Sequence, residues 1–159
     1  MVFGRAFVAL SLFVFSVSLA VFQSPEVTCA QNSAEPWSAA QTVQPTDLQK
    51  ELVGKSAPMV LFVGHERLYN AGHIKGAQFH GMGGSAEGIA EIRKWAEALP
   101  RSTNLVIYCG CCPLGKCPNI RPVFALLHDM GFKKLRVLIL PTSFAVDWVG
   151  QGLPFDHGQ

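Results

Sequence analysis

The chain has 159 residues, of which 49% are hydrophobic, and a formal net charge of +2 at pH 7. Without its N-terminal leader, this length fits one domain with a real hydrophobic core and leaves no room for two. Acidic and basic residues are nearly balanced and no basic run occurs, so we expect no nucleic-acid partner.

The N-terminus has the pattern of a secretory signal peptide. One basic residue, Arg5, precedes an apolar run from Ala6 to Phe22 that only serines interrupt. Thr28 and Ala30 then fit the small-x-small rule for cleavage after Ala30. We therefore expect export to the periplasm or the exterior, with no membrane association after cleavage. An uncleaved membrane anchor is the alternative.

Three segments follow from this pattern: a signal peptide over 1–30, a flexible leader over 31–40 and one domain over 41–159. Within the domain, segments with strand and helix patterns alternate. In chain order we expect a strand over 41–44, a helix over 45–54 capped by Thr46, a strand over 58–63, a short helix or turn over 65–71, and a strand over 78–80. A helix over 85–99, a strand over 105–108, a helix over 119–131, a strand over 135–140 and a helix over 144–149 follow. Such alternation predicts an α/β fold with parallel strands in a three-layer sheet.

The most informative stretch runs from Leu105 to Phe124. A buried strand ends at Tyr108, and four cysteines follow it within nine residues: Cys109, Cys111, Cys112 and Cys117. Asn119 then serves as a candidate N-cap for the next helix. Ligands of open α/β sheets bind past the carboxyl ends of strands, and helix N-termini there attract anions and thiolates. We therefore expect the chemistry of this protein at the cysteine loop.

The cysteine spacing argues against a structural disulfide framework, although the protein is predicted to be exported. Bridges within nine residues close only very small loops and constrain the unfolded chain weakly. A reactive or metal-binding cluster is therefore favoured. A bridge from Cys117 to Cys111 or Cys112 that braces the loop stays open as an alternative.

Three features give the chain a resemblance to the rhodanese-like domain family, from about Val43 to Pro154. They are Gly72-His73-Ile74-x-Gly76-Ala77, the strand ending in Tyr108-Cys109, and the tail Asp147-Trp148-x-x-x-Gly152-Leu153-Pro154. The resemblance implies a parallel sheet of about five strands with helices on both faces. It also implies sulfur transfer through a cysteine persulfide. His73 would then be a hydrogen-bonded structural histidine. Asp147 is expected to be a helix-surface or capping carboxylate.

The chain departs from the family pattern at two places. Family members usually carry an Asp-x-Arg pair before the histidine motif, where this chain has Phe62 and Gly64. The active-site loop, Gly110 to Ile120, is longer than usual and contains three additional cysteines. The donor used by other family members therefore cannot be transferred to this chain.

Cys109 is the predicted catalytic nucleophile, since a sulfurtransferase needs a thiolate that attacks a sulfane sulfur. The helix N-terminus, Lys116 and Arg121 are expected to lower the pKa of Cys109. Lys116, Arg121 and Gly110 are the predicted contacts to a small anionic sulfur donor. A thiol is the expected acceptor.

The additional cysteines support several hypotheses. Cys112 forms a C-x-x-C pair with Cys109 and would resolve the persulfide or act in thiol–disulfide redox chemistry, with Cys111 and Cys117 as further candidates. Cys117, eight positions from Cys109, is expected to matter little for sulfur loading. We expect no cofactor. The alternative is a non-enzymatic scaffold that binds a partner, or a soft metal such as Cu(I) or Zn, through the loop from Cys109 to Cys117.

Overall fold

The computed structural model describes Met1 and residues 35–158. The predicted signal peptide over 1–30, Met1 apart, lies outside the described residues. The leader predicted over 31–40 overlaps the folded domain, because Trp37 is buried and its ring centroid lies 5.4 Å from that of Phe124. Residues from Trp37 onward therefore belong to the domain and not to a flexible leader.

The main sheet has five strands in the order β1-β6-β5-β2-β4, and every neighbouring pair is parallel. The strands are β1 (Thr42–Val43), β2 (Met59–Phe62), β4 (Gln78–Phe79), β5 (Asn104–Tyr108) and β6 (Lys134–Leu138). The predicted parallel α/β sheet is therefore confirmed. β5 is its central strand, which places the cysteine loop at the middle of the carboxyl edge.

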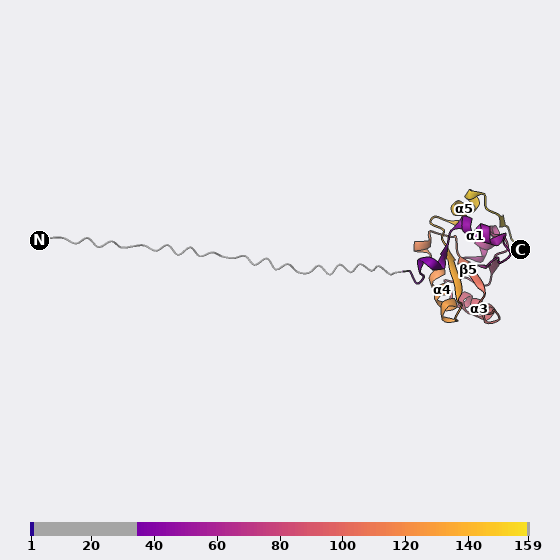
Figure 1. Cartoon of the computed structure of the whole chain (residues 1–159), viewed down its shortest axis with the longest axis horizontal. Helices are drawn as coiled ribbons and strands as arrows, with labels where there is room; N and C mark the ends of the chain where they lie inside the picture. The colour runs from indigo at the N-terminus through magenta and orange to yellow at the C-terminus, as the bar shows by residue number, and fades with distance from the viewer. Residues whose placement is uncertain (2–34, 159) are drawn as a thin grey trace. The chain divides into compact units, whose positions relative to one another are not determined.

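The described residues also contain five α-helices and three short 3₁₀ turns. They are α1 (Pro45–Leu52), α2 (Glu66–Ala71), α3 (Ala86–Glu97), α4 (Ile120–Asp129) and α5 (Phe144–Asp147), with η1 (Ala39–Gln41), η2 (Leu114–Lys116) and η3 (Val149–Gln151). Helices α3 and α4 lie on one side of β5, and α1 and α5 lie on the other (Figure 1). The layers are thus helix, sheet, helix, as predicted.

Alternate residues of β5 point into two separate hydrophobic cores. Leu105 and Ile107 pack with buried residues of α3 and α4, and Cys109, just past the strand, belongs to the same core. Val106 and Tyr108 pack on the opposite face with Leu48 of α1 and with Trp148. The strand is therefore buried on both faces, which explains its continuous apolar sequence.

Helix ends follow local capping rules with one correction. The Ser85 hydroxyl accepts a hydrogen bond from the Gly88 N–H at 3.0 Å and caps α3. Gly131 has φ +88 just after α4, where a left-handed residue ends the helix. The predicted cap Thr46 is wrong: Gln44 is the N-cap of α1, and Pro45 occupies the first helical position, which suits a residue without an N–H.

The histidine motif forms a second, two-stranded sheet beside the first. In it, β3 (His73–Ile74) pairs antiparallel with β7 (Phe155–Asp156), a strand that the sequence did not predict. His73 is buried, with Nδ1 2.8 Å from the Tyr69 carbonyl oxygen, and its ring stacks on Tyr69. The Ile74 N–H donates to the Tyr108 hydroxyl at 2.9 Å and so ties the motif to the end of β5. The structural role predicted for His73 is confirmed.

The closing tail folds back on itself through Trp148. Its indole N–H donates to the Pro154 carbonyl at 2.9 Å, and the residue is fully buried. The Asp147 carboxylate accepts backbone N–H bonds from Thr142 and Ser143 at 2.6 and 2.9 Å. Asp147 is therefore a capping carboxylate, which is one of the two roles that the sequence predicted.

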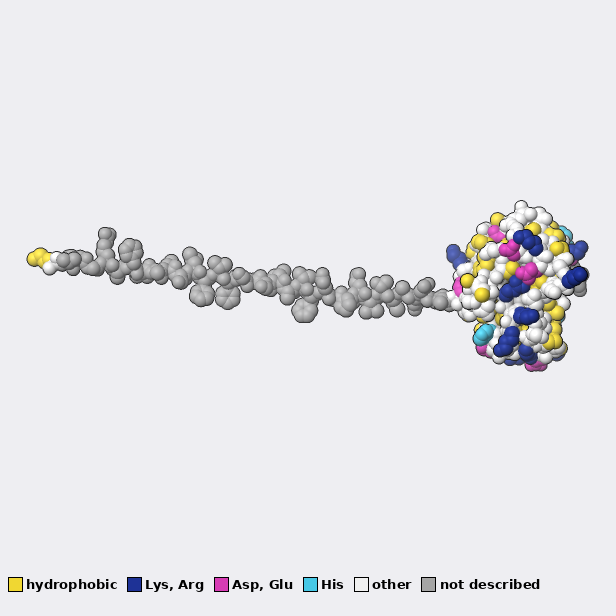
Figure 2. Space-filling view, viewed as in Figure 1, with side chains coloured by type: hydrophobic (Ala, Val, Ile, Leu, Met, Phe, Trp, Pro, Cys, Tyr) yellow, Lys and Arg dark blue, Asp and Glu magenta, His cyan; other side chains and the backbone are white. Residues whose placement is uncertain are grey.

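Charged side chains are spread over the face of the domain that Figure 2 shows. On the face seen in Figure 2, Lys and Arg side chains alternate with acidic and uncharged ones and do not form a single patch. Among the helices of the described residues, none combines the length and the apolar character needed to cross a membrane.

Candidate functional site

Cys109 lies where the chain leaves the central strand. Cys109 is 2% exposed to solvent. The next residue, Gly110, turns the chain and has a φ angle of +74°. A Cβ atom at Gly110 would lie only 2.6 Å from the Phe144 Cβ, so the turn needs glycine there. The Phe144 N–H donates to the Gly110 carbonyl at 3.0 Å and fixes this exit.

The loop then returns to Cys109 through the short turn η2. The Cys117 N–H donates to the Leu114 carbonyl at 3.1 Å, and the Leu114 N–H donates to the Leu140 carbonyl at 3.2 Å. Arg121 braces this return: its guanidinium donates to the carbonyls of Cys117 and Gly115 at 2.9 and 3.3 Å and pairs with the Glu35 carboxylate. Cys117 is thereby held at the start of α4.

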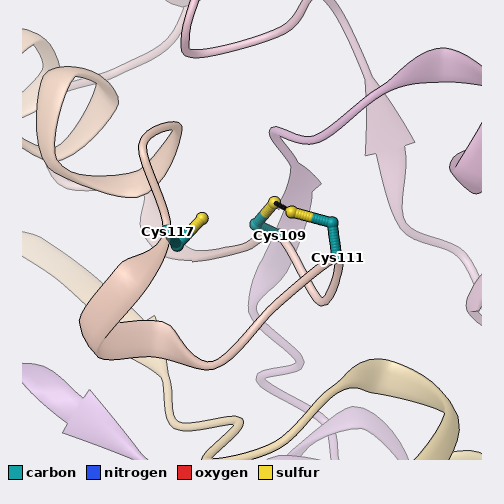
Figure 3. A group of neighbouring side chains, drawn as sticks. All are labelled: Cys109, Cys111 and Cys117. Carbon is teal, nitrogen blue, oxygen red and sulfur yellow. Dashed lines mark hydrogen bonds between the residues drawn. The ribbon is translucent and has the colours of Figure 1, made fainter.

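Four thiols meet as a result, and the structure has all of them free. The Cys109 and Cys111 sulfurs lie 3.0 Å apart, and the Cys111 and Cys112 sulfurs 3.4 Å apart. Figure 3 shows the Cys117 side chain pointing from the far side of the loop toward the Cys109–Cys111 pair. The Sγ atoms of Cys109, Cys111 and Cys117 all lie within 4.8 Å of one another, and these three cysteines could hold a metal ion.

Asn119 supplies a polar contact to this cluster. Its side-chain amide donates to the Cys109 sulfur at 3.3 Å and more weakly to the Cys111 sulfur at 3.9 Å. The residue is the N-cap of α4 by position, but its side chain makes no capping bond to the helix. The amide is thus available to stabilise negative charge on sulfur.

Two glycines hold Asn119 in place. A Cβ atom at Gly83 would lie 2.2 Å from the Asn119 carbonyl oxygen, and one at Gly84 would lie 2.6 Å from its Oδ1. The segment before α3 can approach Asn119 this closely only because these residues lack side chains. Gly64 plays a similar part at Cys109, since its Cβ would lie 3.0 Å from the Cys109 sulfur.

The thiols at the two ends of the loop have opposite pKa shifts. The pKa of Cys117 is lowered to about 5, first by its interaction with the neighbouring Cys109 thiol. The backbone N–H groups of Asn119 and Ile120 at the start of α4 lower it further, against the opposing effect of burial. The pKa of Cys109 is raised by the same interaction with Cys117, by burial and by Cys111.

The predicted low pKa of Cys109 is therefore wrong, and the reason is geometric. The helix N-terminus faces Cys117, so the thiolate resides there at neutral pH while Cys109 keeps its proton. Cys112 also keeps its proton, because burial raises its pKa to about 12.

Two cavities adjoin the cysteines. One is an atom-sized void of about 10 Å³ between Cys109, Cys112 and Cys117. The other has a volume of about 420 Å³, and Cys109, Gly110 and Cys111 form part of its wall. A larger hollow of about 820 Å³ lies along α2 and β3, and no cysteine lines it.

The structure brings together most of the residues that the sequence singled out. Cys109, Gly110, Cys111, Cys112 and Cys117 form one cluster. Lys116 is exposed on η2, and neither cysteine cavity has it in its wall. Arg121 braces the loop through backbone carbonyls, so its guanidinium is already engaged by oxygen atoms.

Sequence reasoning missed the roles of Asn119, Gly64 and Phe144. Asn119 had only the signal of an N-cap, and nothing local indicates that its amide turns toward sulfur. The Gly83-Gly84 pair before α3 was a usable signal, because adjacent glycines often mark a close approach of another backbone.

Comparisons with known proteins give structural matches only. Neither a protein-family model nor a curated protein matches the sequence. A rhodanese-like domain from Anabaena sp. is 24% identical and superposes with a TM-score of 0.54 over 74% of this chain and 79% of its own. A protein from Bacillus halodurans is 18% identical, with a TM-score of 0.58 over 74% of this chain and 77% of its own.

One similar structure is named for an activity. It is a thiosulfate sulfurtransferase from Pseudomonas aeruginosa, which is 25% identical with a TM-score of 0.52. The match covers 77% of this chain and 22% of that enzyme. The chain therefore corresponds to a part of that protein.

Proposed function

We propose, from the premise that residues 35–158 form a rhodanese-like domain, that this chain is a sulfurtransferase in which Cys109 carries sulfur as a persulfide. The position of Cys109 is the observation that supports this proposal most strongly. Cys109 directly follows the central strand of a parallel sheet, its sulfur accepts a hydrogen bond from the Asn119 side-chain amide, and it borders a cavity large enough for a small molecule.

The opposite pKa shifts of Cys109 and Cys117 indicate which thiol acts as the base. Above about pH 5 the neighbouring thiols of Cys109 and Cys117 hold one proton between them, and transfer of that proton from Cys109 to Cys117 produces the Cys109 thiolate. The Cys109 thiolate then attacks the outer sulfur of the donor. The bond between that sulfur and the rest of the donor breaks, and the remainder leaves with the electron pair.

The second half-reaction returns the enzyme to its starting state. An acceptor thiolate attacks the outer sulfur of the Cys109 persulfide, and the Cys109 thiolate leaves. The Asn119 amide stabilises this thiolate and the persulfide anion by a charge-assisted hydrogen bond. The two steps together move one sulfur atom without net oxidation or reduction.

Cys111 is better placed than Cys112 to resolve the persulfide when no acceptor is present. Its sulfur lies 3.0 Å from that of Cys109. Attack of the Cys111 thiolate on the Cys109 sulfur would form the Cys109–Cys111 disulfide and release hydrosulfide. Cys111→Ser should therefore suppress hydrosulfide release from loaded protein, and Cys112→Ser is the matched control. Equal suppression by both variants would reject this assignment.

Intact mass spectrometry tests the proposed function. The purified reduced protein is treated with sulfane donors of several classes, passed through a desalting column and weighed. A gain of one sulfur atom that a thiol acceptor then removes is the expected result. Protein that gains no sulfur from any donor, while remaining folded and reduced, would reject a sulfurtransferase.

A second candidate, binding of a soft metal ion, is favoured by the three sulfurs within 4.8 Å and by the atom-sized void next to them. Cysteine thiolates select ions such as Cu(I). A Cu(I) titration against a competing chelator would then give one tightly bound ion per chain. Serine at Cys109, Cys111 or Cys117 should each weaken that binding, and titration curves unchanged by all three would reject the site.

A further inference from the structure

The cavity beside Cys109 has predominantly apolar walls. It has a volume of about 420 Å³, within the usual range for small-molecule sites. Its side chains come from separate parts of the chain: Phe62 of β2, Leu68 of α2, Phe144 of α5, Val149 of η3 and Phe155 of β7. Cys109 and Cys111 form the polarisable end of this cavity.

No charged counterpart for an anion lines this cavity. Among the described residues in its wall there is no Lys, Arg, Asp or Glu, and His157 is the one titratable residue besides the cysteines. Arg121 donates to two carbonyls and a carboxylate at the far end of the loop. An anionic donor such as thiosulfate would lose its hydration here without gaining a cation, which is unfavourable.

Access to Cys109 from other directions is restricted. Gly64 packs so closely that even a Cβ atom there would lie 3.0 Å from the sulfur. The void toward Cys117 has a volume of about 10 Å³, which is the size of one water molecule. A donor molecule therefore reaches Cys109 through the apolar cavity.

We propose that the sulfur donor is an organic hydropersulfide, R–S–S–H, whose substituent R is apolar, carries no charged group and occupies this cavity. The inference rests on the proposed function and replaces the anionic donor expected from the sequence. The Cys109 thiolate attacks the outer sulfur, the donor S–S bond breaks, and R–S⁻ leaves and takes up a proton. Cys109 then holds the outer sulfur as a persulfide.

Donor preference of the wild-type protein is the first test. Persulfide formation is measured by mass with benzyl hydropersulfide, generated in situ, and with thiosulfate. The second-order rate constant with benzyl hydropersulfide should exceed that with thiosulfate by about a hundredfold, which corresponds to a difference of about 2.8 kcal/mol in activation free energy.

A charge placed in the cavity should shift this preference. Leu68→Arg should lower the rate with benzyl hydropersulfide about tenfold and raise that with thiosulfate about tenfold. Val53→Arg, at a residue 77% exposed and outside the cavity wall, adds the same charge and should change neither rate. Val149→Arg is the second cavity variant and is used if Leu68→Arg does not fold.

The outcomes separate the two proposals. Loading by thiosulfate that equals or exceeds loading by benzyl hydropersulfide would overturn the apolar donor and leave the sulfurtransferase standing. Loading by neither of these donors, nor by any of the other sulfane donors tested for the proposed function, would overturn the sulfurtransferase itself. Identical changes in Leu68→Arg and Val53→Arg would also overturn the cavity as the donor site.

Discussion

Cys109 at the end of β5 and Cys117 at the start of α4 carry the same thiol in opposite surroundings. Cys109 is buried and borders an apolar cavity, and its pKa is raised. Cys117 has its sulfur within 4.8 Å of the Cys109 sulfur but faces the N–H groups of a helix N-terminus, and its pKa is lowered. The reactive position and the ionised position are therefore different residues, and the loop between them serves to bring them together.

Cys109→Ser should have the largest effect, and it tests whether the reactive cysteine and the ionised cysteine are different residues. The variant should lose persulfide formation altogether, by at least about a thousandfold, because a hydroxyl is a poor nucleophile and cannot hold a sulfane sulfur. Mass spectrometry after donor treatment measures the loss. Cys112→Ser is the matched control in the same loop and should load normally. Normal loading of Cys109→Ser would show that Cys109 is not the sulfur carrier.

Cys117→Ser should have the next largest effect. Without the thiolate base, loading at neutral pH should slow about a hundredfold, within the range for loss of a general base. The remaining rate should increase with pH, since Cys109 must then ionise directly. Mass spectrometry of samples quenched at set times gives the loading rate at neutral pH and at higher pH. An unchanged loading rate at neutral pH would show that Cys117 is not the base and, as expected from the sequence, matters little for sulfur loading.

The pH dependence of the wild-type protein tests the lowered pKa of Cys117. A pKa of about 5 means that loading should be independent of pH near neutrality and fall as pH decreases through 5. The sign for stability is the same: the thiolate stabilises the folded state at alkaline pH, and this contribution disappears as Cys117 is protonated near pH 5. Ultraviolet absorbance of the thiolate, with Cys117→Ser as the control, follows the ionisation. A transition near the pKa of an ordinary cysteine would contradict the account.

Asn119→Ala should have the smallest effect of the series. It removes one hydrogen bond to the Cys109 sulfur, worth about 1 kcal/mol, or about a fivefold reduction in the loading rate. Gly84→Ala should act in the same direction by displacing the Asn119 side chain. Asn119→Asp separates polarity from packing: it keeps the shape but presents a carboxylate to sulfur, so it should slow loading more than Ala.

Much of the fold could be predicted because its signals are local. The apolar run of β5, the alternation of strands with helices, the Ser85 cap and the Gly131 stop each follow from neighbouring residues. β7 could not be predicted from such signals, since its two residues form a strand only through pairing with β3. Trp37 likewise joins the domain through a distant contact with Phe124.

The site was predictable in composition but not in arrangement. The four cysteines and the carboxyl end of β5 are evident from the sequence. Which thiol faces the helix N-terminus depends on how η2 returns the loop, and that return depends on Arg121 and its pairing with the distant Glu35. For the same reason the sequence assigned the low pKa to Cys109.

Peptide-resolved mass analysis of loaded protein tests the central claim most directly. Trypsin cleaves after Lys116 and separates Cys117 from the peptide 102–116, and the Cys111→Ser/Cys112→Ser double variant leaves Cys109 as the one cysteine of that peptide. The protein is loaded at pH 6, where Cys117 is ionised and Cys109 is not. The account predicts that the sulfur appears on the peptide 102–116. Sulfur on the peptide that begins at Cys117 would show that the ionised thiol is itself the carrier, and would contradict the account.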